Sequence, residues 1–264
     1  MSHRDVLADF TAEPVTLLGE TKEVFRIGAG PAIILIPEIP GITPQHAALA
    51  RRLAAQGYTV VSPSLFGVPG RPMSNANALA VIARACVAKE FAAFATGSTR
   101  PVTAWLRALA EREHSACGGK GVGVIGMCFT GGFGLAMMLS DAVVAPVLSQ
   151  PSLPLPLGAA RRADYGLDPN DLARILERTA NGACVVGLRF TEDRAVPAER
   201  FAALRQDLGD AFTAFEIDST PGNAHGIAKS AHSVLTHDFV DEPGHPTRIA
   251  YDHVLEFFAS RLPG

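Results

Sequence analysis

Residues 121–132 constrain the fold of this chain more than any other segment. They read GVGVIGMCFTGG, in which an apolar strand pattern ends at Gly126, a cysteine follows at Cys128, and small residues open a helix predicted to run through Leu139. Enzymes that carry a nucleophile on a tight strand-to-helix turn need this layout, because the strained turn tolerates only small neighbours and the helix N-terminus offers free N–H donors. A thiol placed there is biased towards the reactive thiolate. The segment alone fits a buried structural cysteine equally well.

The composition favours a globular protein with a sizeable core. Of the 264 residues, 48% are hydrophobic and 19% are charged, and the formal net charge of −3 gives no electrostatic footprint for nucleic acid. The longest apolar runs are too short to span a bilayer, and no apolar signal core follows the N-terminus, so we expect a cytoplasmic protein without membrane attachment. Four scattered cysteines without a C-x-x-C pair argue against a zinc ribbon or a disulfide framework.

Strand-like apolar runs alternate with segments of helical periodicity, which predicts a mostly parallel sheet covered on both faces. The strands are expected at residues 24–27, 32–36, 59–62, 122–125, 142–148, 183–188 and 212–217. The helices are expected at residues 45–56, 76–95, 103–112, 172–180, 197–208 and 247–261. Two loops, residues 67–72 and the proline-rich residues 151–158, are candidates to shape a pocket, and the histidine-rich residues 225–245 are also expected to be loop. We expect a single domain over residues 1–264.

A cysteine nucleophile needs a base, and that base needs an orienting acid. Asp193 follows the strand expected at 183–188, and His225 follows the strand expected at 212–217, so the chain order is nucleophile, acid, histidine. This order is the one used by the α/β-hydrolase fold, and ligands of open α/β sheets bind beyond the carboxyl ends of strands. Each residue has an alternative reading: Asp193 could serve the following helix or be replaced by Glu192, and His225 is one of eight histidines.

With these residues in view, the chain resembles the dienelactone hydrolase family, a cysteine-nucleophile branch of the α/β hydrolases. The resemblance runs from about residue 33 to residue 258 and rests on the motifs at residues 36–41, 126–132, 192–197 and 224–226. It implies an α/β-hydrolase fold with a mostly parallel central sheet and helices on both faces. It also implies hydrolysis of an ester, thioester or lactone bond without a cofactor or a metal.

The resemblance assigns roles to particular residues. It implies Cys128 as the nucleophile, His225 as the general base and acid, and Asp193 as the partner of the histidine. Glu38 is implied to hold the resting thiol. The backbone N–H groups of Phe129 and Ile39 are implied to form the oxyanion hole; the position of Phe129 directly after the nucleophile points the same way, whereas nothing else in the sequence singles out Glu38 or Ile39.

The chain departs from the family pattern at several positions. Thr130 occupies the first of the two closing glycine places of the elbow, although Gly131 follows. Val68 stands where the family has a substrate-binding arginine, and Lys229 stands at the second arginine position, with Arg71 as another cation that could reach the pocket. A lysine lacks the bidentate fork with which arginine binds a carboxylate. The expected substrate class is therefore a small ester, thioester or lactone, without commitment to a dienelactone.

Other functions compete with this interpretation. A non-hydrolytic ligand-binding protein could use the same fold, and Cys128 could instead be a redox sensor, although no resolving thiol is close in the sequence. Histidines and aspartates within residues 225–245 match no zinc-binding spacing, so no metal site is expected. We expect a monomer or a small homo-oligomer that acts on a small molecule.

Overall fold

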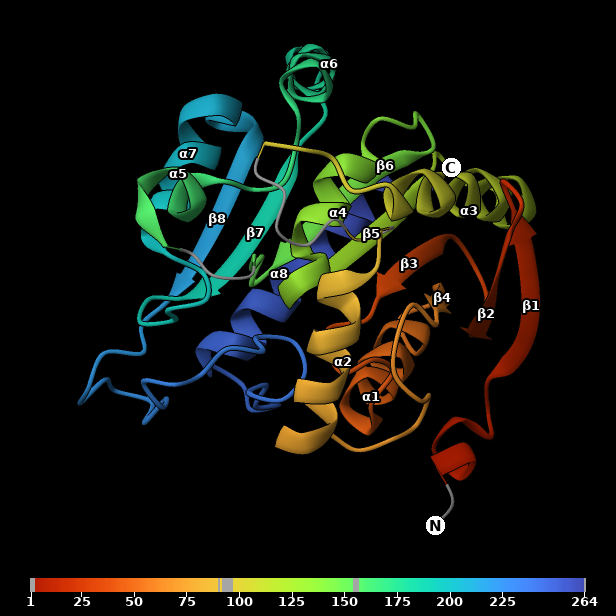
Figure 1. The fold of residues 1–264 in the computed structure, drawn as a ribbon, viewed down its shortest axis with the longest axis horizontal. Coiled ribbons are helices and arrows are strands. Elements are labelled where there is room, and N and C mark those ends of the chain that lie inside the picture. The colour runs from red at the N-terminus through yellow and green to blue at the C-terminus, as the bar shows by residue number, and fades with distance from the viewer. Residues whose placement is uncertain (1–2, 90, 92–96, 154–156, 264) are drawn as a thin grey trace.

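The computed structural model describes residues 3–89, 91, 97–153 and 157–263. Within them the chain forms an eight-stranded sheet in the order β1-β2-β4-β3-β5-β6-β7-β8 (Figure 1). Neighbouring strands from β4 to β8 run parallel, whereas β1, β2 and β4 pair in antiparallel fashion. The strands are β1 (Thr11–Leu17), β2 (Glu20–Ile27), β3 (Ala32–Ile36), β4 (Thr59–Pro63), β5 (Val122–Met127), β6 (Val143–Ser149), β7 (Val185–Phe190) and β8 (Phe212–Ile217).

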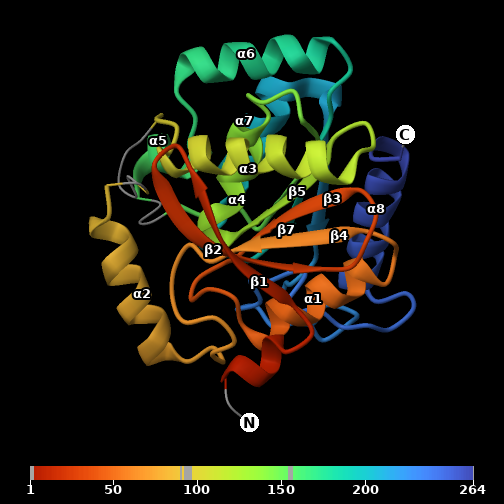
Figure 2. The same ribbon diagram turned by 90° about the vertical axis from the view of Figure 1, so that its right-hand side faces the viewer.

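Helices cover both faces of this sheet. They are α1 (Pro44–Ala54), α2 (Asn75–Val87), α3 (Val102–Cys117), α4 (Gly131–Met137), α5 (Gly158–Ala163), α6 (Pro169–Ala180), α7 (Ala198–Leu208) and α8 (Pro246–Arg261), with short 3-10 turns η1 (His3–Leu7), η2 (Cys128–Thr130) and η3 (Gly209–Ala211). Figure 2 shows α3 on one side of the strands and α1 on the other. None of the helices among the described residues has the length and apolar character needed to cross a membrane.

Side chains that alternate along each strand form a separate hydrophobic core on each face of the sheet. In β3, Ile33 and Leu35 pack into the cluster that also contains residues of α1 and α8, whereas Ile34 and Ile36 pack into the cluster formed with α3, α4 and α7. All these side chains are fully buried. Successive side chains of a strand point to opposite faces, so a strand covered on both sides must be apolar throughout. This explains why β3 could be recognised from its sequence.

The structure confirms the expected fold class and each of the seven expected strands. It adds β1, which was not expected because its sequence contains Pro14 and buries only Val15; a proline is tolerated at a sheet edge, where the ladder lacks a neighbour. It also adds the short helix α5. The helix expected at 76–95 corresponds to α2, and part of that range, like residues 154–156 of the expected loop 151–158, lies outside the described residues.

The parallel strands bring distant segments to one edge of the sheet. The carboxyl ends of β3, β5, β6, β7 and β8 lie at the same edge, because these neighbouring strands are all parallel. The segments that follow them carry Glu38, Cys128, Ser152, Asp193 and His232, respectively. This edge is therefore where a site built from all five segments can form.

Candidate active site

Cys128 occupies a strained turn between β5 and α4. Its φ angle is +53°, a left-handed conformation that is uncommon for residues other than glycine. Two glycines make the turn possible: a Cβ on Gly126 would lie 2.3 Å from the Thr130 carbonyl oxygen, and one on Gly131 would lie 2.4 Å from Cα of Pro151. The small residues recognised in the sequence thus allow the backbone to fold tightly behind the cysteine.

Thr130 is part of this turn rather than a disturbance of it. Its fully buried hydroxyl accepts a hydrogen bond from the Met127 amide at 3.0 Å and lies 2.8 Å from the Met127 carbonyl oxygen. The same hydroxyl lies 3.2 Å from the carbonyl oxygen of Pro37, the residue before Glu38. A glycine at this position could make none of these contacts. Thr130 therefore ties the elbow to the segment that follows β3.

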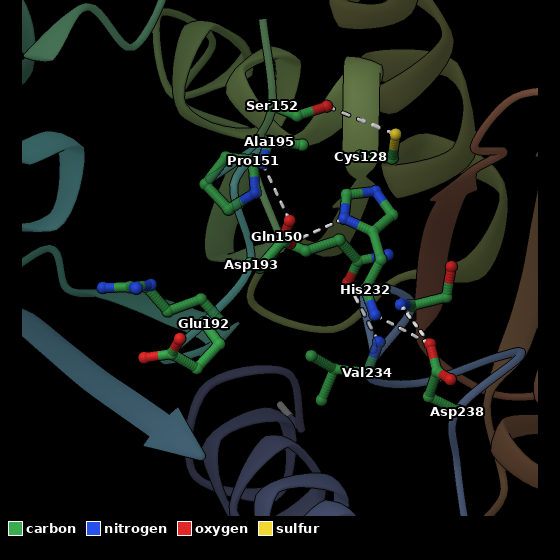
Figure 3. Close-up of polar contacts among 12 residues, drawn as sticks. Cys128, Gln150, Pro151, Ser152, Glu192, Asp193, Ala195, His232, Val234 and Asp238 are labelled. Atoms are coloured by element: carbon green, nitrogen blue, oxygen red, sulfur yellow. Dashed lines mark hydrogen bonds and ion pairs between the residues drawn. The ribbon is translucent and has the colours of Figure 1, made fainter. Parts of the chain in front are cut away.

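Asp193 and His232 form a close carboxylate–imidazole pair at the site. Nδ1 of His232 lies 2.6 Å from Oδ2 of Asp193, which is only 8% exposed. An ionised carboxylate can only accept, so Nδ1 carries the proton and Nε2 is left for another partner. Figure 3 shows the imidazole lying between Asp193 and Cys128. The three side chains come from three separate strand ends.

The pKa of His232 reflects this position between two anionic partners. Burial by itself would lower the pKa, but the charge of Cys128 and the hydrogen bonds to Asp193 and Cys128 outweigh it and hold the pKa well above its ordinary value. The same interactions favour a proton on the imidazole beside the sulfur of Cys128. This arrangement suits a thiol that attacks as a thiolate.

His225, the histidine expected to be the base, lies elsewhere. It is exposed, and its ring packs edge-on against His245 with the ring centroids 5.5 Å apart. The histidine that contacts Asp193 is His232, seven residues further along the same irregular segment. The choice failed because this segment lacks a helix or strand that would fix its path, so only tertiary contacts decide which histidine reaches the acid.

Backbone contacts hold the acid and the histidine in place. Oδ1 of Asp193 accepts the Ala195 amide at 2.9 Å, which closes a turn around the acid. On the other side, Oδ2 of Asp238 accepts the amides of both His232 and Ser233 at 2.8 Å. The histidine is therefore fixed by Asp238 in its own segment as well as by Asp193 (Figure 3).

Glu38 is buried and fully engaged, but its hydrogen bonds do not involve the thiol. It is 2% exposed and accepts hydrogen bonds from Ser233 Oγ at 2.8 Å, from Thr236 Oγ1, and from Gln150 Nε2 at 3.2 Å. Ser233 directly follows His232, so the carboxylate anchors the histidine segment to the segment after β3. The sulfur of Cys128 instead lies 3.2 Å from Oγ of Ser152.

The two expected oxyanion donors lie where free amides are available. Phe129 is at the start of η2, where the first N–H groups have no partner within the helix. Ile39 lies in the turn after β3, and among the described residues its amide donates to no protein acceptor. Both amides therefore remain available to a ligand, one beside the nucleophile and one beside Glu38.

Lys229 and Arg71, the two cations expected to bind the substrate, do not contact Cys128 or His232. Lys229 is 55% exposed at its side chain and pairs with Glu192 at 3.3 Å. It borders a hollow of about 490 Å³ that is also lined by residues 192–195 and Ser230. Arg71 is exposed on the loop 67–72. Within the described parts of the chain, no group of histidine, cysteine, aspartate or glutamate side chains is arranged to hold a metal ion.

His232, Ser152 and Gln150 are residues of the site that were not predicted from the sequence. One signal could have favoured His232: it is flanked by Ala231 on one side and Val234 and Leu235 on the other, which are all buried. His225, by contrast, follows a polar run containing glycine and proline. Apolar neighbours in an irregular segment indicate which part of it is drawn into the core.

Comparisons with known proteins show the family and the fold of the chain. The sequence pattern of the dienelactone hydrolase family matches residues 16–262. No curated protein matched the chain. Among solved structures, a candidate dienelactone hydrolase from Klebsiella pneumoniae subsp. pneumoniae superposes with a TM-score of 0.61 and 18% identity, covering 95% of this chain and 98% of that one. Est1E from Butyrivibrio proteoclasticus gives 0.57 and 14% identity, covering 94% and 98%.

A third solved structure, the dienelactone hydrolase-like promiscuous phosphotriesterase P91 from metagenomic libraries, gives a TM-score of 0.56 and 18% identity, covering 96% of this chain and 99% of that one. At these identities the likeness shows a shared fold, whereas the family match covers nearly the whole chain. The chain therefore belongs to the dienelactone hydrolase family of α/β hydrolases and is an ester or lactone hydrolase.

Proposed function

We propose that this protein hydrolyses small ester, thioester or lactone substrates through a triad of Cys128, His232 and Asp193 and a covalent acyl-enzyme intermediate. The observation that carries the proposal is the contact of 2.6 Å between Asp193 and His232, with the imidazole directed at the cysteine of a strained elbow. Cysteine, histidine and acid arranged in this way form the nucleophile, base and orienter that acyl transfer requires.

The reaction proceeds in two halves. Nε2 of His232 takes the proton of Cys128, and the thiolate attacks the carbonyl carbon of the substrate. The oxyanion that develops accepts hydrogen bonds from the amides of Phe129 and Ile39. His232 then gives its proton to the leaving alcohol or thiol as the carbon–oxygen or carbon–sulfur bond breaks.

In the second half, His232 takes a proton from water, and the resulting hydroxide attacks the thioester formed on Cys128. The carbon–sulfur bond breaks, the acid product leaves, and the thiolate is restored beside the protonated histidine. Asp193 keeps the imidazole in one orientation and stabilises its charge throughout. Glu38 takes no part in proton transfer in this scheme, because its oxygens are already occupied by three donors.

The proposed reaction does not require a carboxylate group on the substrate. Lys229 is paired with Glu192, and Val68 stands where the family pattern has an arginine, so neither of these two positions offers the guanidinium fork that binds a carboxylate through both oxygens. We therefore propose small neutral or singly charged acyl groups as the substrate class.

The test uses p-nitrophenyl acetate and butyrate with four variants. We expect Cys128→Ala and His232→Gln to lower kcat/KM by at least about a thousandfold, and Asp193→Asn by on the order of a hundredfold to ten-thousandfold. His225→Gln is the matched control, because it removes an exposed histidine of the same segment, and it should retain wild-type activity.

The intermediate can be seen directly. Mass spectrometry of rapidly quenched enzyme should find an acyl group on the peptide containing Cys128. Activity that survives Cys128→Ala, or an equal loss in His225→Gln and His232→Gln, would contradict the proposed triad. Stoichiometric acylation without product release would instead make the protein a covalent binder.

A further inference from the structure

Ser152 makes two contacts with Cys128. Its Oγ lies 3.2 Å from the sulfur, and its backbone amide donates to the Cys128 carbonyl oxygen at 2.9 Å (Figure 3). Ser152 is 8% exposed and follows β6, whose last residue, Ser149, pairs with Met127 of β5. The parallel pairing of these strands therefore delivers the serine beside the elbow.

The position of Ser152 is fixed by a network that does not depend on substrate. The amide of Gln150 donates to the Leu188 carbonyl oxygen at 2.7 Å, and its side chain donates to Glu38. The guanidinium of the fully buried Arg200 donates to the Pro151 carbonyl oxygen at 2.8 Å. Contacts on both residues before Ser152 thus hold its hydroxyl against the sulfur.

The direction of this hydrogen bond follows from the chemistry of the two groups. A thiolate can only accept, whereas a serine hydroxyl has one proton to donate and, among the described residues, contacts no other acceptor. A hydrogen bond to an ionised partner is stronger than one between neutral groups. The contact of 3.2 Å is therefore worth most when the sulfur carries the charge.

We propose that Ser152 is a further catalytic residue, which donates a hydrogen bond to the thiolate of Cys128 and so favours its charged form and fixes its direction. This inference rests on the proposed function of Cys128 as the nucleophile. Once His232 has taken the proton of Cys128, the sulfur has the imidazolium on one side and the hydroxyl on the other. No proton of Ser152 is transferred; the hydroxyl remains a donor throughout.

The same donor acts again when the acyl group leaves. In deacylation the carbon–sulfur bond breaks and its electron pair returns to the sulfur, so negative charge grows where the hydroxyl points. Ser152 therefore stabilises the departing thiolate and accelerates the second half of the reaction. The hydroxyl also stabilises the thiolate before attack, but at high pH the thiolate forms without its help. Removal of the hydroxyl should therefore have little effect on kcat/KM at high pH and should lower kcat more strongly, because kcat includes deacylation.

Other charged groups around the sulfur are shared by all the variants tested. His232 faces it from the segment after β8, with Asp193 behind the imidazole, and Glu38 lies in the segment after β3. Arg200 reaches the neighbouring Pro151 carbonyl from α7. A change caused by replacing Ser152 can therefore be assigned to the hydroxyl as long as the packing around it is kept.

The experiment compares Ser152→Thr with Ser152→Val, two side chains of nearly equal shape that differ in the hydroxyl. Iodoacetamide alkylation of the Cys128 peptide is followed by mass spectrometry over a range of pH, which separates it from the other cysteines. We expect Ser152→Thr to keep the wild-type midpoint and Ser152→Val to raise it by about one pH unit. Ser152→Val should also lower kcat for p-nitrophenyl butyrate by about tenfold, with burst kinetics showing acyl-enzyme that accumulates.

Ser260→Ala is the control, since this serine of α8 is exposed and its hydroxyl donates to the Phe257 carbonyl oxygen within the same helix. Equal alkylation midpoints for Ser152→Thr and Ser152→Val would overturn the inference, even if Cys128→Ala abolishes hydrolysis. A raised midpoint in Ser152→Val together with ester turnover that survives Cys128→Ala would support the thiolate contact but refute the proposed triad.

Discussion

His46 makes the stability of this protein depend on pH in a way that can be calculated. It lies in the first turn of α1, directly after the segment that carries Glu38 and Ile39. Its side chain is fully buried, Nε2 lies 2.9 Å from Oγ of Ser62, and Nδ1 has no hydrogen-bond partner among the residues that the structure describes. Burial disfavours the charged imidazolium and lowers the pKa of His46 from 6.5 to about 3.

The sign follows from which state binds the proton. As the pH falls below 6.5, the unfolded chain protonates His46 while the folded protein does not, so the folded state loses stability. The loss continues until the pH reaches about 3, and the difference between the two pKa values corresponds to about 5 kcal/mol in total. Between about pH 7.5 and about pH 5, His46 should lower the free energy of unfolding by about 2 kcal/mol.

Urea unfolding of the wild type and of His46→Gln at these two pH values measures this contribution. The loss of stability on acidification should be smaller in His46→Gln by about 2 kcal/mol, whatever the variant costs at neutral pH. His232, whose raised pKa acts in the opposite direction, is present in both proteins and cancels. His225→Gln, which removes an exposed histidine, should lose the same free energy of unfolding between the two pH values as the wild type. An identical pH dependence in wild type and His46→Gln would refute the reasoning.

Substitutions at three further positions test the scaffold of the site. Gly131→Ala should lower the free energy of unfolding by about 1–3 kcal/mol, because the new Cβ meets Pro151 at 2.4 Å; a variant as stable as the wild type in urea would contradict the tight packing of the elbow. Arg200→Met removes a buried guanidinium that donates to four backbone carbonyls, so we expect the free energy of unfolding to fall by about 3–5 kcal/mol in urea. A loss smaller than about 1 kcal/mol would show that these loops keep their positions without the guanidinium. Thr130→Val strands the Met127 amide and should cost about 1–3 kcal/mol and slow ester hydrolysis, whereas Thr130→Ser should restore both; failure of the serine to rescue would mean that the methyl group matters instead.

The sequence predicts those parts of the molecule whose local residue pattern directly reflects how they are buried in the fold. The buried strands are continuous apolar runs because helices cover both of their faces, and Cys128 and Asp193 stand out because each directly follows such a strand. The strand β1 escaped prediction because an edge strand with Pro14 buries almost nothing.

The base could not be predicted in the same way. His225 and His232 lie in one irregular segment, and no periodicity tells which of them enters the site. The contacts that decide it come from elsewhere in the chain: Asp193 and Glu38 reach the segment from the ends of β7 and β3. Ser152 was hidden for a similar reason, since the pairing of β5 with β6 brings it to the sulfur.

The hydrogen bonds of Glu38 to Ser233 and Thr236 also bear on when the protein becomes active during folding. Its partners Ser233 and Thr236 lie 195 and 198 residues away along the chain, among the most remote pairings in the fold. Closing so long a loop costs entropy that only the rest of the structure can offset, so such contacts form late. During synthesis, the elbow and its thiol emerge well before the histidine segment. We therefore expect ester cleavage to appear during folding only after the segment that carries His232 and Ser233 has packed against Glu38.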